Sequence, residues 1–245
     1  WIAKDEDEHA PDSILEDLDA IAKQIHIPDP NNVLDAVSRI NQHLFYELRF
    51  QGDVSDYYNP QNSLIHKVLA RRQGLPILLS IIYIEIARRL DVAISGVGCP
   101  QHFLVQPAEC GEVQFFIDPF DKGAIVTEPD LLDWHHHWGI DLPFEQCIQP
   151  TPNREVLLRV CHNLFYAHNR LHQCEGMLRA IHRLMILQPE MTQLHRTRSV
   201  ILGKMQRFPE SLDALETYIL YNPDAQDIQA CQRDMTMLKQ LCRSQ

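Results

Sequence analysis

The chain has 245 residues, of which 45% are hydrophobic, so it is long enough to fill one large core or two small ones. Its formal net charge of −11, with histidine neutral, argues against binding to nucleic-acid phosphates and to anionic membrane surfaces. Seven cysteines without a C-x-x-C pair favour reduced thiols over a disulfide framework, and no apolar run reaches membrane-spanning length, so we expect a cytoplasmic protein.

The first seventy residues are predicted to be mostly helical and to cover a more apolar helix that follows them. One helix is expected over residues 12–25, with Asp12–Ser13 as its cap. A second is expected from Asn31–Asn32 to about residue 50, and a third over residues 64–72, behind a cap at Asn62–Ser63.

Residues 74–123 form the centre of the predicted fold. Pro76 suits the first turn of a helix, and residues 77–90 are apolar around most of the helix surface, which predicts a central, buried helix. Three short β-rich runs follow, one of them carrying His102 and another ending in Asp118. A helix followed by a small antiparallel sheet indicates an α+β fold, here mostly helical.

Four motifs carry a family resemblance: residues 57–63 (YYNPQNS), 72–76 (RQGLP), 100–105 (PQHFLV) and 117–120 (IDPF). Together they resemble the transglutaminase-like core of the SirB family of bacterial proteins, and the match extends over nearly all of the chain. The resemblance implies a papain-like arrangement in which a Cys at a helix start, a His and an Asp act as a triad. One departure is Gln101, where the family usually has Gly.

The resemblance also implies that the nucleophile is missing. In transglutaminase-like enzymes a Gly-x-Cys motif opens the helix, whose N-terminus stabilises a thiolate. Laid on Gly74-Leu75-Pro76, the Cys position is Pro76, while His102 and Asp118 take the positions of the base and its orienting carboxylate. A base with nothing to activate forms no acyl-enzyme, so we expect no ordinary thiol catalysis.

Five side chains in or near this degenerate triad have alternative interpretations. Ser80, one turn beyond Pro76, could approach His102, or it could hydrogen-bond its own helix backbone. Cys99 would face away from His102 on a strand, because positions three apart point to opposite sides, so we expect burial or a loop role for it instead. Glu85, the only acid in the apolar helix, could pair with His102, pair with an arginine, or reach solvent. Asp118 could simply open a turn with Pro119, and His102 could be a core histidine.

Three consecutive histidines, residues 135–137, lie between Trp134 and Trp138. Consecutive side chains diverge on a helix, so one ion would rarely take all three, and we expect neither a metal nor a cofactor. The two tryptophans are interpreted as packing anchors.

A proline-rich linker (Pro143, Pro150 and Pro152) predicts a domain boundary near residue 150, with domains 1–150 and 151–245. Beyond it the pattern is entirely helical. Residues 180–190 align with residues 214–224 at a spacing of 34, which is the period of tetratricopeptide (TPR) repeats. The TPR-like tail that the resemblance implies agrees with this spacing.

Three functions are consistent with these observations. The first is a non-catalytic interaction protein whose TPR-like repeats bind a protein or peptide partner. The second is a hydrolase or acyltransferase that uses Ser80, or a water activated by His102 and Asp118. The third, which the SirB resemblance implies, is a regulator of gene expression that acts through other proteins rather than by direct contact with nucleic acid, and it overlaps with the first.

Overall fold

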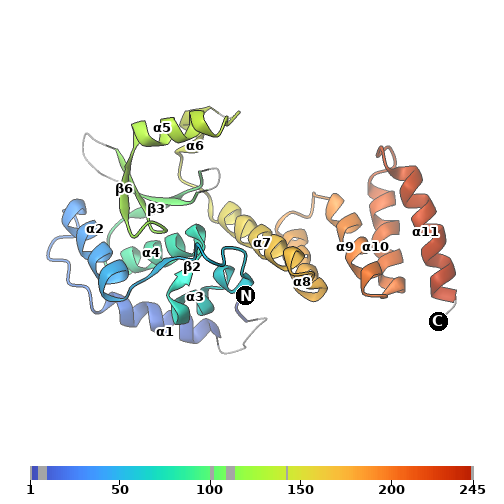
Figure 1. The fold of residues 1–245 in the computed structure, drawn as a ribbon, viewed down its shortest axis with the longest axis horizontal. Coiled ribbons are helices and arrows are strands. Elements are labelled where there is room, and N and C mark those ends of the chain that lie inside the picture. The colour runs from blue at the N-terminus through green and yellow to red at the C-terminus, as the bar shows by residue number, and fades with distance from the viewer. Residues whose placement is uncertain (1, 5–9, 100–101, 109–113, 142, 244–245) are drawn as a thin grey trace. The chain divides into compact units, whose positions relative to one another are not determined.

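The computed structural model describes residues 2–4, 10–99, 102–108, 114–141 and 143–243. The chain divides into two compact units, Trp1–Val156 and Leu157–Gln245. The first unit has a mixed α+β architecture and the second is helical, as the sequence predicts (Figure 1). The position of the domain boundary at residue 150 stays a prediction.

The first unit is built around α4 (Pro76–Arg89), whose residues are buried on most sides, as expected from its apolar sequence. Helices α1 and α3 pack against it, α2 contacts it, and strands β3 and β4 pack on it from another direction (Figure 1). The bounds of these elements are α1 Ala10–Ala22, α2 Val33–Asn41, α3 Ile65–Arg71, β3 Ile94–Val97 and β4 Leu104–Pro107.

The sheet has four antiparallel strands in the order β3-β4-β5-β6. Strand β5 spans Phe115–Asp118 and strand β6 spans Ala124–Thr127. Strand β6 was not predicted. The β-branched run from Ile125 to Thr127 behind Gly123 was the available signal, and Gly123 provides the positive φ (78°) that the connecting turn requires.

Smaller elements position the loops around α4. A π-helical turn, η1 (Gln42–Glu47), continues α2, and a 3₁₀ turn, η2 (Pro60–Ser63), precedes α3. Two short strands, β1 (Gln51–Gly52) and β2 (Gln73–Gly74), pair in parallel. After the sheet come α5 (Glu128–His137) and α6 (Phe144–Cys147).

Two of the three predicted helix caps are wrong. Helix α1 begins at Ala10, so Ser13 lies inside it and its hydroxyl donates to the Ala10 carbonyl. Asn62–Ser63 do not cap α3, because they lie in η2 and the Asn62 side chain bonds elsewhere. The third prediction is confirmed, since the Asn32 side chain accepts a hydrogen bond from the Asp35 backbone and caps α2.

The second unit consists of α-helices joined by short turns. Neighbouring helices pack in sequence order: α8 on α9, α9 on α10, and α10 on α11. A buried serine pair joins α9 to α10, since each hydroxyl of Ser199 and Ser211 donates to the carbonyl of the other residue at 2.8 Å. The bounds are α7 Asn153–Arg170, α8 Cys174–Leu187, α9 Gln193–Lys204, α10 Phe208–Tyr221 and α11 Ile228–Arg243.

Candidate functional site

The start of α4 is held by a buried polar network that the sequence did not predict. The Leu75 backbone N–H, just before α4, donates to the Asn62 carbonyl at 3.1 Å. The fully buried Asn62 side chain donates to Asp53 at 3.1 Å and accepts from Arg71 at 2.9 Å. Arg71 also pairs with Asp53 at 3.2 Å. The loop before α3 is thereby fixed against the helix start.

Asp53 is the charged centre of this network. Burial raises the pKa of its carboxyl, but hydrogen bonds from the Asp56 backbone and from Ser55, Asn62 and Arg71 outweigh burial and leave the pKa below its ordinary value. The signal in the sequence was partial: Asn62 lies in one of the family motifs, but nothing in the sequence singles out Asp53.

Pro76 is the first residue of α4 and is buried. This is the place where a proline is tolerated, because the first N–H of a helix has no partner within the helix. Its pyrrolidine ring has no nucleophilic atom. The structure therefore puts an inert side chain at the helix start to which the resemblance assigns the cysteine.

His102 and Asp118, which are 16 residues apart in the sequence, come together in space. His102 Nδ1 lies 3.3 Å from Asp118 Oδ2, and the Asp118 side chain is almost fully buried. The other carboxylate oxygen, Oδ1, accepts the backbone N–H of Phe120 at 2.9 Å. Asp118 ends β5, as predicted, whereas His102 precedes β4 instead of lying within a strand. The Pro100 and Gln101 positions of the motif lie outside the described residues.

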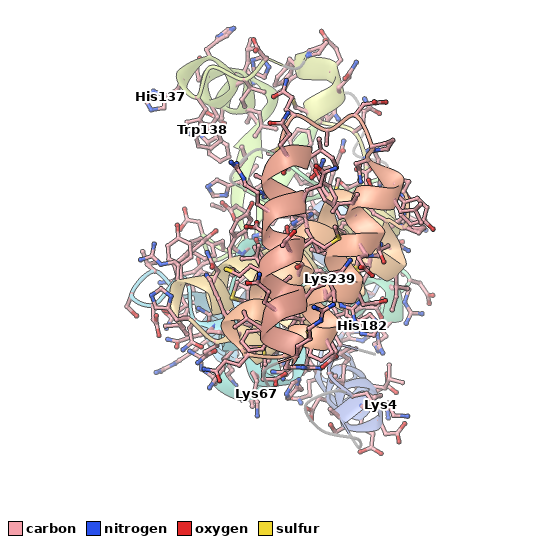
Figure 2. All side chains as sticks on the ribbon, turned by 90° about the vertical axis from the view of Figure 1, so that its right-hand side faces the viewer. Lys4, Lys67, His137, Trp138, His182 and Lys239 are labelled. Carbon is pink, nitrogen blue, oxygen red and sulfur yellow. The ribbon has the colours of Figure 1, made fainter. Side chains whose placement is uncertain are left out.

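Trp134 of α5 and Trp138, the residue that follows α5, stack with the imidazole of His102. The centroid of the His102 ring lies 5.0 Å from that of Trp134 and 6.0 Å from that of Trp138, with interplanar angles of 28° and 11°. The sequence suggested packing anchors here but did not reveal what they pack against. Figure 2 shows the neighbouring His137 pointing out from the end of α5. Among the described residues, no three His, Cys, Asp or Glu side chains form a group that could hold a metal.

Ser80 is fully buried and its hydroxyl donates to the Phe103 carbonyl at 2.9 Å. The alternative that it bonds its own helix is wrong: the hydroxyl crosses from α4 to the residue that follows His102. This bond occupies the hydroxyl proton, and it ties the imidazole-bearing segment to the central helix.

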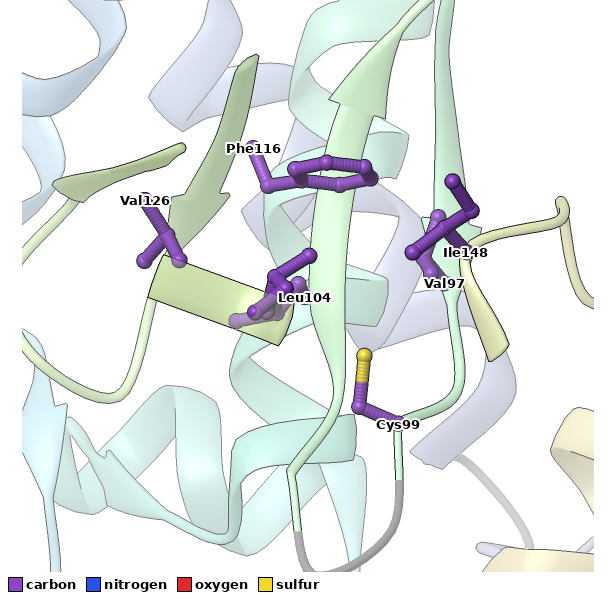
Figure 3. Packing of buried hydrophobic residues seen from close by; sticks show 7 residues of the cluster. Val97, Cys99, Leu104, Phe116, Val126 and Ile148 are labelled. Carbon is purple, nitrogen blue, oxygen red and sulfur yellow. The ribbon is translucent and has the colours of Figure 1, made fainter. Parts of the chain in front are cut away.

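Cys99 lies just beyond β3, so the alternation of side chains on a strand does not apply to it, and its expected burial outside a strand is confirmed. Its thiol is buried and contacts the Cys147 carbonyl at 3.6 Å. Figure 3 shows it at one end of an apolar cluster formed with Val97, Leu104, Phe116, Val126, Leu131 and Ile148. Its position is that of a core side chain.

Glu85 pairs with arginines, which was one of the alternatives left open by the sequence. Its carboxylate lies 3.0 Å from Arg88 and 2.7 Å from Arg89, and Arg89 also pairs with Asp19 of α1 at 2.6 Å. Partial burial raises the pKa of Glu85, but the hydrogen bonds and charges of the two arginines outweigh burial and lower it overall. Glu85 thus holds Arg89, whose ion pair with Asp19 links α4 to α1.

Comparison with known proteins identifies the family. The family model described as "Transglutaminase-like superfamily" matches residues 12–162, more than half of the chain. The chain belongs to this transglutaminase-like superfamily. A UPF0162 protein of Xylella fastidiosa (strain Temecula1) is 30% identical over 198 residues, covering 78% of the chain and 70% of that protein. The narrower assignment to the SirB family stays a prediction.

Two other relatives match longer and shorter parts of the chain. A UPF0162 protein of Pseudomonas aeruginosa is 28% identical over 231 residues, covering 91% of the chain and 83% of that protein. F-box only protein 21 of Homo sapiens is 41% identical over 104 residues, but these cover only 40% of the transglutaminase-like chain and 16% of that protein. No solved structure matches the chain.

Proposed function

We propose that this transglutaminase-like chain is a non-catalytic protein-binding protein, in which α7 to α11 form TPR-like repeats that dock a protein or peptide partner. The observation that carries the proposal is Pro76 at the first position of α4, where the resemblance assigns the nucleophile. Losing the nucleophile of such a catalytic unit lowers the rate about a million-fold. Ser80 supplies no substitute, because it is buried and its hydroxyl proton is engaged by Phe103.

The experiment has a catalytic arm and a binding arm. In the first, the intact chain and its Ser80→Ala and His102→Ala variants are incubated with a p-nitrophenyl ester and with a glutaminyl peptide plus an amine. We expect the same background rate for all three proteins. Turnover that disappears in either variant would overturn the proposal.

The binding arm uses the intact chain as bait in reduced native lysate, with chemical cross-linking and mass spectrometry. We expect a saturable partner whose cross-links fall on α7 to α11. Cross-links confined to Trp1–Val156 would move the binding surface to the core unit and contradict the TPR-like role. A partner that itself controls transcription would match the regulatory role that the SirB resemblance implies.

A hydrolase or acyltransferase is the second candidate, favoured by the 3.3 Å contact between His102 and Asp118. In this alternative the imidazole activates a water molecule, since Ser80 is occupied. It predicts turnover that disappears in His102→Ala and survives in Ser80→Ala, which the catalytic arm measures directly.

A further inference from the structure

A groove of about 380 Å³ lies on the second unit, lined by α8, the C-terminal half of α9, and the start of α10. Helix α8 contributes side chains at the spacing of one helical face, from Glu175 through Arg179 and His182 to Met185. Figure 2 labels His182, which is exposed on this part of the molecule.

The floor of the groove is apolar. Leu178 and Met185 of α8 are half-buried, and Leu202 of α9 is buried at 1% exposure. Methionine adapts its shape to different apolar side chains, because its chain is unbranched and polarizable. The floor therefore suits one apolar side chain of a bound segment.

The rim of the groove is lined by arginine and glutamate side chains. Both of its carboxylates face Arg207: Glu210 forms two hydrogen bonds with it, at 2.7 and 2.6 Å, and Glu175 lies 3.9 Å away. The hydrogen bond from Arg207, together with the charges of Arg207 and Arg198, holds the pKa of Glu210 below its ordinary value. Arg207 is thus already neutralised within the groove.

Arg198 differs from Arg207 in forming no ion pair with these two carboxylates. It lines the groove and, within the described part of the chain, no carboxylate lies at ion-pair distance from it. Arg179 also lines this rim. Arg198 therefore offers a guanidinium group with no carboxylate of the described residues at ion-pair distance, on a chain whose net charge is −11.

We propose that this groove binds an acidic peptide segment, with an apolar side chain on the floor of Leu178, Met185 and Leu202 and a carboxylate at Arg198. The inference rests on the proposed protein-binding function and names the class of partner. A short acidic segment fits better than a nucleic acid, because a phosphate backbone extends beyond the groove over a chain of strongly negative net charge.

The test is fluorescence anisotropy with the intact chain and a labelled peptide in which a central leucine is flanked by glutamates. A peptide with glutamine in place of every glutamate and a labelled oligothymidylate serve as the other probes. The chain is used as wild type and as Arg198→Glu, Arg198→Gln and Arg233→Glu. Arg233 is exposed on α11, outside the groove, and its substitution changes the charge by the same amount as Arg198→Glu.

We expect Arg198→Glu to weaken binding of the acidic peptide about tenfold or more, because a favourable charge contact becomes a repulsive one. Arg198→Gln should weaken it less, and Arg233→Glu should change it by less than about twofold, since salt screens distant exposed charges. Melting curves of all variants check folding, and Arg198→Gln still tests the proposal if Arg198→Glu unfolds.

Three results would overturn the inference: equal affinity for the glutamine peptide, equal losses in Arg198→Glu and Arg233→Glu, or tighter binding of the oligothymidylate with the same dependence on Arg198. If wild type and Arg198→Glu capture a partner equally, the groove inference is wrong but the proposed protein-binding function stands. Turnover that depends on His102 would instead contradict the proposed function, whatever the peptide result.

Discussion

His102 contacts Asp118, Trp134 and Trp138, so removing its imidazole should lower the stability of the fold even if no reaction depends on it. His102→Ala removes the ring stacking and leaves a buried carboxylate without its imidazole. We expect a loss of about 1–3 kcal/mol in unfolding free energy, measured as a lower melting temperature by circular dichroism. The control is His137→Ala, which removes an exposed histidine at the end of α5. Equal melting temperatures for the two variants would refute a structural role for the pair.

Asp53 makes a second prediction at the residue scale. Asp53→Asn removes the charge that Arg71 and Asn62 face in a buried network, and we expect it to cost about 1–3 kcal/mol. Urea unfolding measures the change. Asp35→Asn, which breaks an exposed pair with Arg39, should cost less than about 1 kcal/mol. A smaller loss for Asp53→Asn than for Asp35→Asn would mean that the network does not stabilise the start of α4.

Sequence reasoning found the residues of the degenerate triad but not their surroundings. His102, Asp118 and Pro76 were named from motifs that are local in sequence. The partners of Ser80 and Cys99 are carbonyl groups of Phe103 and Cys147, which no side-chain pattern reveals. Arg88 and Arg89 lie three and four residues after Glu85, which is one helical turn. Helical spacing alone could therefore have predicted that Glu85 pairs with them.

At the scale of elements, α5 carries Trp134 and is followed directly by Trp138, the two rings that stack on His102, and its start is fixed by a capping box. The Thr127 side chain accepts from the Asp130 backbone, and the Asp130 carboxylate accepts from the Thr127 backbone at 2.8 Å. Loosening this end of α5 should therefore change the fluorescence of the two tryptophans.

Thr127→Ala should destabilise the first unit by about 1 kcal/mol, because it removes the N-cap acceptor. We also expect a change in tryptophan fluorescence, read in the same urea titration. Thr217→Ala is the control, since the Thr217 hydroxyl donates only within its own helix, to Asp213. If Thr127→Ala leaves both the midpoint and the fluorescence unchanged, α5 is held by packing rather than by its cap.

Helices were predicted better than strands and caps. The aligned segments 180–190 and 214–224 fall on the second halves of α8 and α10 and on the turns that follow them, because packing there follows the helical period. The short strands β1 and β2 were missed, since their pairing joins segments that are distant in the sequence. The π-helical turn η1 falls within the helix that was expected to run to about residue 50. Asn62 was misassigned as a cap because its side chain serves a long-range network, which overrides its local preference.

For the whole molecule, ionised carboxylates in the fold predict sensitivity to acid. Asp53 and Glu85 have lowered pKa values when folded, so the unfolded chain binds more protons than the folded chain in the acid range. Their stabilisation is therefore present above their ordinary pKa values of 3.8 and 4.5 and is lost as pH falls through the lower folded values.

Urea midpoints measured from about pH 6 down to about pH 3 test this expectation. The wild type should lose stability as the pH falls through this range. A chain carrying Asp53→Asn and Glu85→Gln should start less stable and show a flatter dependence. Parallel curves for the two proteins would show that other groups govern acid unfolding.

The sequence predicted both the mixed core and the helical tail, and the superfamily match supports the core. In the described residues, no helix is long and apolar enough to cross a bilayer. The groove on the second unit could not be predicted from helical periodicity, because its side chains come from three helices. A pattern within one helix also does not show that Arg207 is neutralised by Glu175 and Glu210.

The burial of α4 has a consequence for the nascent chain during its synthesis on the ribosome. Helix α4 leaves the ribosome before the sheet that packs on it, whose last strand ends 38 residues later, between residues 89 and 127. At about 5–20 residues per second this delay lasts about 2–8 s. During that interval one of the most apolar helices of the protein is without its sheet, so nascent-chain chaperones have a defined window in which to shield it.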